Sequence, residues 1–170
     1  VMRESNIASV VVRLMICGRS YWLLRWHERW RDWSLLGGHV ESHETDDWSV
    51  TAVRELEEEM PPLRAGIDFD AVPLDAPSTR FSAPSRSHGG IETRYEVRWH
   101  SVRFLAPPAG CVLRIDRRQF ALCSEMALCD GDQQGVANLV VRAAGALASC
   151  QTLLRLMAEL PDACGLSILK

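Results

Sequence analysis

The sequence contains almost no lysine: Lys170 is the one lysine among its 19 basic residues, and the others are arginine. Arginine side chains recognise phosphate groups well, but an arginine-favouring coding bias explains the same composition, so the excess alone assigns no ligand. The formal net charge is −3. A charge of this sign and size argues against a general nucleic-acid or membrane-surface binder, and we expect neither as a partner.

Paired cysteines, a leader pattern and a long apolar run are also lacking. The six cysteines form no CxxC pair, and no charged, apolar and small-residue signal pattern opens the sequence. No apolar run reaches the roughly 18 residues of a membrane span. We therefore expect a soluble, cytoplasmic protein with reduced thiols. The chain is long enough for its own core, and we expect a single domain over residues 1–170.

The first forty residues carry strand patterns. The β-branched run 7–17, IASVVVRLMIC, and the run 21–27, YWLLRWH, flank Gly18-Arg19-Ser20, and this order predicts a hairpin of buried strands. A third, short strand is predicted over 33–41, broken by Gly37-Gly38. Two glycines allow the backbone to turn sharply or to approach a ligand closely.

From Asp46 onwards the apolar residues recur at helical spacing. Asp46 or Asp47 can cap the start of this helix, and Pro61-Pro62 prevents its continuation. We therefore predict one helix over roughly 47–60. Its apolar stripe consists of Trp48, Ala52, Val53, Leu56 and Met60.

The second half of the chain predicts fewer elements. Residues 73–92 are rich in proline, glycine and small polar residues, which indicates a long loop. Strands are predicted over 93–106 and 111–115, followed by a long closing helix over 134–160 that bends at Gly145. The predicted order is β-β-β-α-β-β-α, which places the chain in the α/β (α+β) class.

The predicted first helix ends in a cluster of carboxylates. Glu55, Glu58 and Glu59 stand at i, i+3 and i+4, on the face away from the apolar stripe. Such oxygens suit a hard divalent cation, and the negative end of the helix dipole favours one further. Arg54 can pair with Glu58. An acidic helix face that is only solvated is the alternative.

The residues around this cluster resemble the signature of the Nudix hydrolases. Its box consists of Gly, five residues, Glu, seven residues, Arg-Glu-apolar-x-Glu-Glu, one residue, Gly and an apolar residue. The chain carries WSLLGGHVE before its carboxylates, and the box spans about 38–62. The matching residues are Gly38, Glu44, Arg54, Glu55, Leu56, Glu58 and Glu59.

The resemblance implies an α/β/α sandwich around a mixed sheet, which agrees with the predicted element order. It also implies a site for Mg²⁺ or Mn²⁺ with Glu55, Glu58, Glu59 and the Gly38 carbonyl as ligands. Glu58 and Glu59 would then be catalytic, and Arg54 would orient the carboxylates. The family places its general base variously, so Glu59, Glu92, Asp116 and Glu125 remain alternatives for that role.

Two departures from the family pattern concern this site. Nine residues instead of seven separate Glu44 from Arg54, so Glu44 is an uncertain box position that Asp46 could replace. The extra residues are expected to bulge before Trp48. After the last glutamate pair, Met60-Pro61-Pro62 replaces the family's glycine and apolar residue. Proline stops a helix but cannot adopt the left-handed cap of glycine, so we expect a different exit loop.

Other polar and aromatic residues give weaker signals. His39 and His43 are four apart, but no third soft ligand is near them, which disfavours zinc. Four tryptophans could either stack on a nucleobase or pack in the core. Three loop arginines could either contact phosphate or be solvated. These residues are Trp22, Trp26, Trp30, Trp33, Arg80, Arg86 and Arg94.

We predict metal-dependent hydrolysis of a diphosphate linkage in a nucleoside diphosphate derivative. The alternative is an inactive Nudix-like domain that senses a nucleotide. In both cases the expected partner is a small nucleotide, with a homodimer left open and the substrate-binding residues unassigned.

Overall fold

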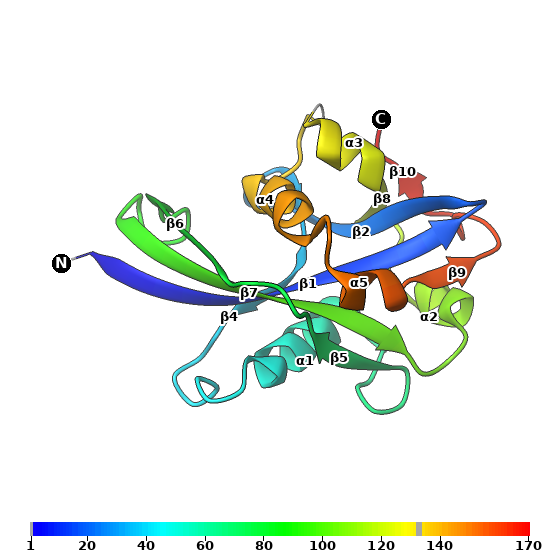
Figure 1. Ribbon diagram of the computed structural model, residues 1–170, viewed down its shortest axis with the longest axis horizontal. Coiled ribbons are helices and arrows are strands. Elements are labelled where there is room, and N and C mark those ends of the chain that lie inside the picture. The colour runs from blue at the N-terminus through cyan, green and yellow to red at the C-terminus, as the bar shows by residue number, and fades with distance from the viewer. Residues whose placement is uncertain (1, 132–133) are drawn as a thin grey trace.

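The computed structural model describes residues 2–131 and 134–170, in which ten strands form one mixed sheet with helices on both faces (Figure 1). The main strand order is β10-β8-β2-β1-β7-β5. The strands are β1 (Arg3–Ile16), β2 (Arg19–His27), β3 (Asp32–Ser34), β4 (Leu36–His39), β5 (Phe69–Pro73), β6 (Thr79–Pro84), β7 (Glu92–Phe104), β8 (Phe120–Ser124), β9 (Ala158–Leu160) and β10 (Ser167–Ile168). The helices are α1 (Trp48–Glu59), α2 (Pro108–Arg114), α3 (Glu125–Asp130), α4 (Asn138–Leu147) and α5 (Gln151–Arg155).

Strand β1 is the centre of the sheet. It pairs antiparallel with β2 and β4 and parallel with β7 and β9. The predicted hairpin is confirmed, with Val12 opposite Leu23. Its turn lies at Cys17 and Gly18, which both have positive φ, at 48° and 76°. The short third strand of the prediction is two strands, β3 and β4, and Gly37-Gly38 lies inside β4.

Two hydrophobic clusters fill the space between the sheet and its helices. The alternation of β1 sends Val10 and Val12 into the first cluster, under α1 and α2, and Val11 into the second, under α3, α4 and α5. Figure 1 shows α1 on one side of the sheet and α3 and α4 on the other. This arrangement confirms the expected α/β/α sandwich around a mixed sheet.

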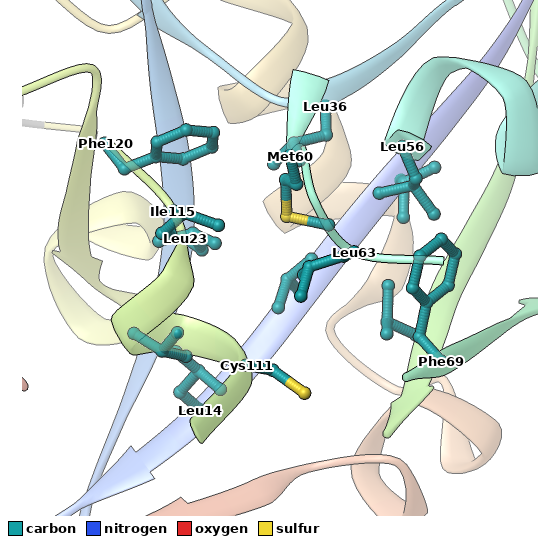
Figure 2. Close-up of a cluster of buried hydrophobic side chains, with 14 of the residues drawn as sticks. Leu14, Leu23, Leu36, Leu56, Met60, Leu63, Phe69, Cys111, Ile115 and Phe120 are labelled. Carbon is teal, nitrogen blue, oxygen red and sulfur yellow. The ribbon is translucent and has the colours of Figure 1, made fainter. Parts of the chain in front are cut away.

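The first cluster anchors the end of α1 (Figure 2). Met60 and Leu63, just after the helix, are 2% and 3% exposed. They pack among side chains from β1, β2, β4 and α2, including Leu14, Leu23, Leu36, Cys111 and Ile115. Because both side chains are buried, the exit segment that carries Pro61-Pro62 is held against the core even without the family's glycine cap.

Three predictions for the second half of the chain are wrong. The predicted loop 73–92 contains β6, which pairs antiparallel with β7. The predicted strand 111–115 lies mostly in α2, which has proline at its first helical turn. The predicted helix over 134–160 is divided into α4 and α5, separated by residues 148–150, and it ends before β9; Gly145 lies within α4.

The elements β5, β8, β10 and α3 were not predicted, whereas the strand predicted over 93–106 corresponds to β7. No helix within the described residues is long and apolar enough to cross a membrane.

Candidate active site

Helix α1 carries the carboxylates of the box, and its buried stripe determines where they point. Asp47 caps the helix, because its side chain accepts a hydrogen bond from the Ser49 N–H at 2.9 Å. The predicted helix over 47–60 is confirmed as Trp48–Glu59, without a break. Residues 41–47 are not helical, so they accommodate the longer spacing of the box. The buried residues of α1 are Trp48, Thr51, Ala52 and Leu56.

Two glycines of β4 lie at close contacts, one with β1 and one with α1. Gly37 has φ +104°, and a Cβ there would overlap the carbonyl oxygen of Ala8 in β1. A Cβ on Gly38 would overlap the carboxylate of Glu55. The close approach at Gly37-Gly38 is thus made by β1 and by a glutamate of the box. Gly37 requires glycine, because its positive φ and the Ala8 carbonyl both exclude a side chain, whereas at Gly38 the Glu55 side chain would have to move.

Glu44 and Arg54 form a buried ion pair beside this contact. Glu44 is 3% exposed. Its two oxygens accept from Arg54 Nε at 2.9 Å and from Nη2 at 3.1 Å, and its Oε2 also accepts from Thr51 Oγ1 at 2.8 Å. The Arg54 hydrogen bonds lower the pKa of Glu44 to about 2. The longer spacing therefore does not separate Glu44 from Arg54, and Asp46 is exposed and does not take its place.

The other box carboxylates have unequal environments. Glu55 is 17% exposed and accepts from Arg54 Nη1 at 2.8 Å, while Glu58 is 61% exposed and lies 3.5 Å from the same nitrogen. Glu59 is 13% exposed. Its Oε2 accepts from the Gly37 N–H at 2.9 Å, and its Oε1 lies 3.4 Å from Arg25 Nη1. Arg54 thus supports two of the three carboxylates.

The predicted convergence of Glu55, Glu58 and Glu59 is not formed in this conformation. Over residues 2–131 and 134–170, no group of three or more His, Cys, Asp or Glu side chains is arranged to hold a metal ion. The physical reason is that like charges one turn apart repel. Glu59 therefore turns to the Gly37 N–H, and Arg54 takes the carboxylates of Glu55 and Glu58.

Burial leaves two of these carboxylates with incomplete compensation. Desolvation raises the pKa of Glu59 to about 7, against the opposing effects of the Gly37 N–H and Arg25. Desolvation also raises the pKa of Glu55 despite its hydrogen bond with Arg54. A bound divalent cation stabilises the ionised form of carboxylates that burial makes costly to ionise, and their oxygens are the hard donors that it prefers. The carboxylate oxygens of Glu55, Glu58 and Glu59 beside Gly38 therefore suit Mg²⁺ or Mn²⁺ by their chemistry, although they do not converge in this conformation.

The four candidates for the general base lie in different parts of the structure. Glu125 begins α3 on the other face of the sheet and pairs with Arg13 at 2.8 Å. Glu92 is exposed at the start of β7. Asp116 follows α2 and lines a cavity together with Arg25. The side chain of Arg25 lies 3.4 Å from Glu59. Glu59 itself lies within the box.

The histidines of the box region have other contacts. The Nδ1 of His39 lies 2.8 Å from Ser5 Oγ, and His43 is exposed, 3.5 Å from Glu41. Within the described part of the chain, neither histidine belongs to a group of three or more side chains that could hold a metal ion.

The weaker aromatic and arginine signals are mostly explained by packing and pairing. Trp22 is buried, the rings of Trp26 and Trp33 lie 5.3 Å apart, and Arg86 stacks over Trp30 at 4.7 Å. The three loop arginines form ion pairs with carboxylates. These pairs are Arg80 with Glu96, Arg86 with Asp32 and Arg94 with Glu4.

Two residues near the site were not predicted. Thr51 carries a polar signal, because it is a hydroxyl residue on the buried side of α1, beside Ala52. Arg25 carries no local signal, since its contact with Glu59 joins residues 34 positions apart in the chain.

Comparison with known proteins gives a consistent fold. No protein-family model matches the chain, and no curated protein matches it significantly. A Nudix hydrolase from M. smegmatis, RenU, is 17% identical with a TM-score of 0.50, covering 89% of this chain and 88% of its own. A NUDIX-family hydrolase from Clostridium perfringens is 18% identical with a TM-score of 0.50, covering 84% and 95%.

A third similar structure is NrtR from Shewanella oneidensis. It is 16% identical with a TM-score of 0.54, covering 84% of this chain and 61% of NrtR, and NrtR also has a structure in complex with a 27-mer DNA. At these identities the comparisons show the fold alone. The fold is that of the Nudix hydrolases, as the box residues predicted.

Proposed function

We propose that this protein hydrolyses a diphosphate linkage in a nucleoside diphosphate derivative, with Mg²⁺ or Mn²⁺ as cofactor. The observation that carries the proposal is the placement of Glu55 and Glu59: both are largely buried against Gly37-Gly38, and Arg54 is fixed beside them by Glu44. A role in the core alone does not account for two partly compensated buried carboxylates, which cost stability.

Glu55, Glu58 and Glu59, with the Gly38 carbonyl, would hold the cation. When bound, the cation would neutralise the anionic oxygens of the diphosphate and lower the pKa of a coordinated water. The protein side chains position the ligands of the cation. Arg54 orients Glu55 and Glu58 through its Nη1, and Glu44 holds the guanidinium in place. Glu58 is exposed, and its carboxylate would rotate towards Glu55 to complete the set of ligands.

Glu59 is the proposed general base. Its Oε2 accepts from the Gly37 N–H, and its Oε1, which lies 3.4 Å from Arg25 Nη1, would accept a proton from the attacking water. The products would be a mononucleotide and a phosphorylated remainder. Glu58 takes part in the same site as a ligand, and Arg54 acts through the carboxylates that it positions.

A nucleotide-sensing domain without hydrolysis is the second candidate. It is favoured by the longer spacing within the box and by the outward position of Glu58. The two candidates share the nucleotide and differ in whether the diphosphate linkage is cleaved.

Hydrolysis separates the two candidates. A panel of nucleoside triphosphates, dinucleoside polyphosphates, nucleotide sugars and ADP-ribose is incubated with Mg²⁺ or Mn²⁺, and the mononucleotide formed from each is measured by anion-exchange chromatography. We expect at least one nucleotide to be cleaved. Binding without cleavage of any panel member supports the sensing domain instead.

On the cleaved substrate, Glu59→Gln should lower kcat by roughly 10²-fold or more, because the loss of about 3 kcal/mol of transition-state stabilisation has that effect. Glu57→Gln, two residues earlier on the exposed side of α1, is the matched control and should stay within about twofold. Circular dichroism checks that both variants fold. Full activity in folded Glu59→Gln contradicts the assigned base.

A further inference from the structure

A cavity of about 490 Å³, lined in part by Arg25, the arginine that contacts Glu59, has no assigned ligand. It lies between the end of β2 with the turn that follows it and the segment between α2 and β8. We call it the arginine cavity. Its lining residues are Arg25, Trp26, His27, Glu28, Arg29, Asp116, Arg118 and Gln119. Its size is within the range of small-molecule sites, roughly 300–1,000 Å³.

Arg25 joins the arginine cavity to the box. Its Nη1 lies 3.4 Å from Glu59 Oε1, longer than a close ion pair, and its Nε is buried with no hydrogen-bond partner in the described residues. A buried guanidinium N–H without an acceptor costs free energy, and an anionic oxygen is its natural partner. An unsatisfied donor of this cavity-lining arginine therefore lies buried next to the proposed cation site.

The charge of the lining is positive. Arg25, Arg29 and Arg118 contribute three positive charges, against the negative charges of Glu28 and Asp116. Arg118 and Asp116 lie 3.4 Å apart on an exposed surface, and Arg29 forms no ion pair with any described carboxylate. A concave surface with an excess of guanidinium groups concentrates anions.

A second cavity of the same volume, at the start of α1, has a different balance. Its three carboxylates, Asp46, Asp47 and Glu96, outnumber its two arginines. Both arginines lie near the same carboxylate, Arg80 at 2.9 Å and Arg98 at 3.5 Å from Glu96. The arginine cavity is thus the one of the two that is suited to an anion.

We propose that the arginine cavity binds the phosphate chain of the substrate beyond the scissile diphosphate. The substrate class is then nucleotides with three or more consecutive phosphates, in preference to nucleotide sugars, whose departing half carries a neutral sugar. This inference rests on the proposed function, because the box must hold the diphosphate that is cleaved. The contact between Arg25 and Glu59 joins the proposed cation site to the arginine cavity. A phosphate chain would extend from the cation into the cavity.

The test uses Arg29→Ala/Arg118→Ala, a double variant that does not alter Arg25 or the box. Arg155→Ala, an exposed arginine of α5, is the matched control. Hydrolysis of ATP and GTP is compared with hydrolysis of ADP-ribose at equal Mg²⁺. In the double variant, kcat/KM for the triphosphates should fall about tenfold more than kcat/KM for ADP-ribose, mainly through KM, because charge-assisted hydrogen bonds to phosphate are lost. The control variant should match the wild type.

Binding is measured separately, by calorimetric titration with inorganic tripolyphosphate in the absence of metal. The wild type and Arg155→Ala should bind it, and the double variant should bind it roughly tenfold more weakly. Equal affinity in all three proteins, or no binding to the wild type, overturns the inference. A preference of the wild type for ADP-ribose over ATP and GTP also overturns it.

Failure of the proposed function gives a different result. If no nucleotide is cleaved while tripolyphosphate still binds in an arginine-dependent way, the hydrolase proposal is wrong and the arginine cavity remains a phosphate site. If ADP-ribose is cleaved and tripolyphosphate does not bind, the hydrolase proposal stands and the cavity assignment is wrong.

Discussion

Two glutamates of the box region, Glu44 and Glu59, have similar burial and opposite electrostatics. Glu44 is 3% exposed and its four hydrogen bonds lower its pKa to about 2. Glu59, also mostly buried, has one close N–H donor and a distant guanidinium, and desolvation raises its pKa to about 7. The difference shows that donors around the carboxylate, rather than burial alone, decide whether it serves the fold or is available for chemistry.

The largest effect should come from removing the charge of Glu44. In Glu44→Gln, Arg54 loses its bidentate partner, and a broken buried pair costs several kcal/mol. Because Arg54 is 27% exposed, solvent screens part of this loss, and we expect a decrease of about 2–3 kcal/mol in the free energy of unfolding. Urea denaturation measures it.

Asp46→Asn is the matched control for that variant. Asp46 is exposed, so its substitution should change the free energy of unfolding by no more than about 0.5 kcal/mol. A larger loss in Asp46→Asn than in Glu44→Gln would show that the wrong carboxylate has been assigned to Arg54.

The two glutamates should also give opposite pH dependences in metal-free protein. Glu44 has a folded pKa below its ordinary value of 4.5, so its contribution to stability is present above pH 4.5 and is lost as the pH falls towards 2. Glu59 has a folded pKa above 4.5, so the stability associated with its protonated form is present below pH 4.5 and is lost as the pH rises through 7.

Denaturation at several pH values with chelator present can resolve the Glu59 contribution. Between pH 5 and pH 8, the wild type should lose about 2 kcal/mol more stability than Glu59→Gln, which has no proton to release. Parallel curves for the two proteins would mean that the Glu59 carboxylate is better compensated than its surroundings indicate.

The sequence predicted the parts of the structure that depend on local pattern. The helix over 47–60 has a clear apolar period, a capping aspartate and a proline stop, and the hairpin has two β-branched runs around a glycine. The segment 111–115 was wrongly predicted because a short apolar run suits a strand or a helix equally. Pro107-Pro108 was interpreted as a turn, whereas Pro108 begins α2.

The division of the predicted helix 134–160 was not visible in its apolar stripe. Ala148 to Cys150 separate α4 from α5, yet Leu147, Cys150 and Leu153 still face the same core. Burial of that stripe therefore does not require a continuous helix. The strand β6 was missed because its order comes from pairing with β7, not from its own apolar content.

The box residues could be predicted from spacing, but their contacts could not. Glu44 keeps its pair with Arg54 because residues 41–47 form turns that bring the two together. The contact of Arg25 with Glu59 depends on how β2 lies against α1 in three dimensions, and no pattern within either segment specifies it.

Metal binding to the box tests the central claim most directly. Mn²⁺ or Mg²⁺ is titrated calorimetrically into the wild type, Glu58→Gln/Glu59→Gln and the control Glu57→Gln, and thermal unfolding is followed with and without metal. The account predicts at least roughly tenfold weaker binding in the double variant, unchanged binding in the control, and a stabilisation of the wild type by about 2.7 kcal/mol at a hundred times its dissociation constant. Equal metal affinity in the wild type and the double variant would contradict the site.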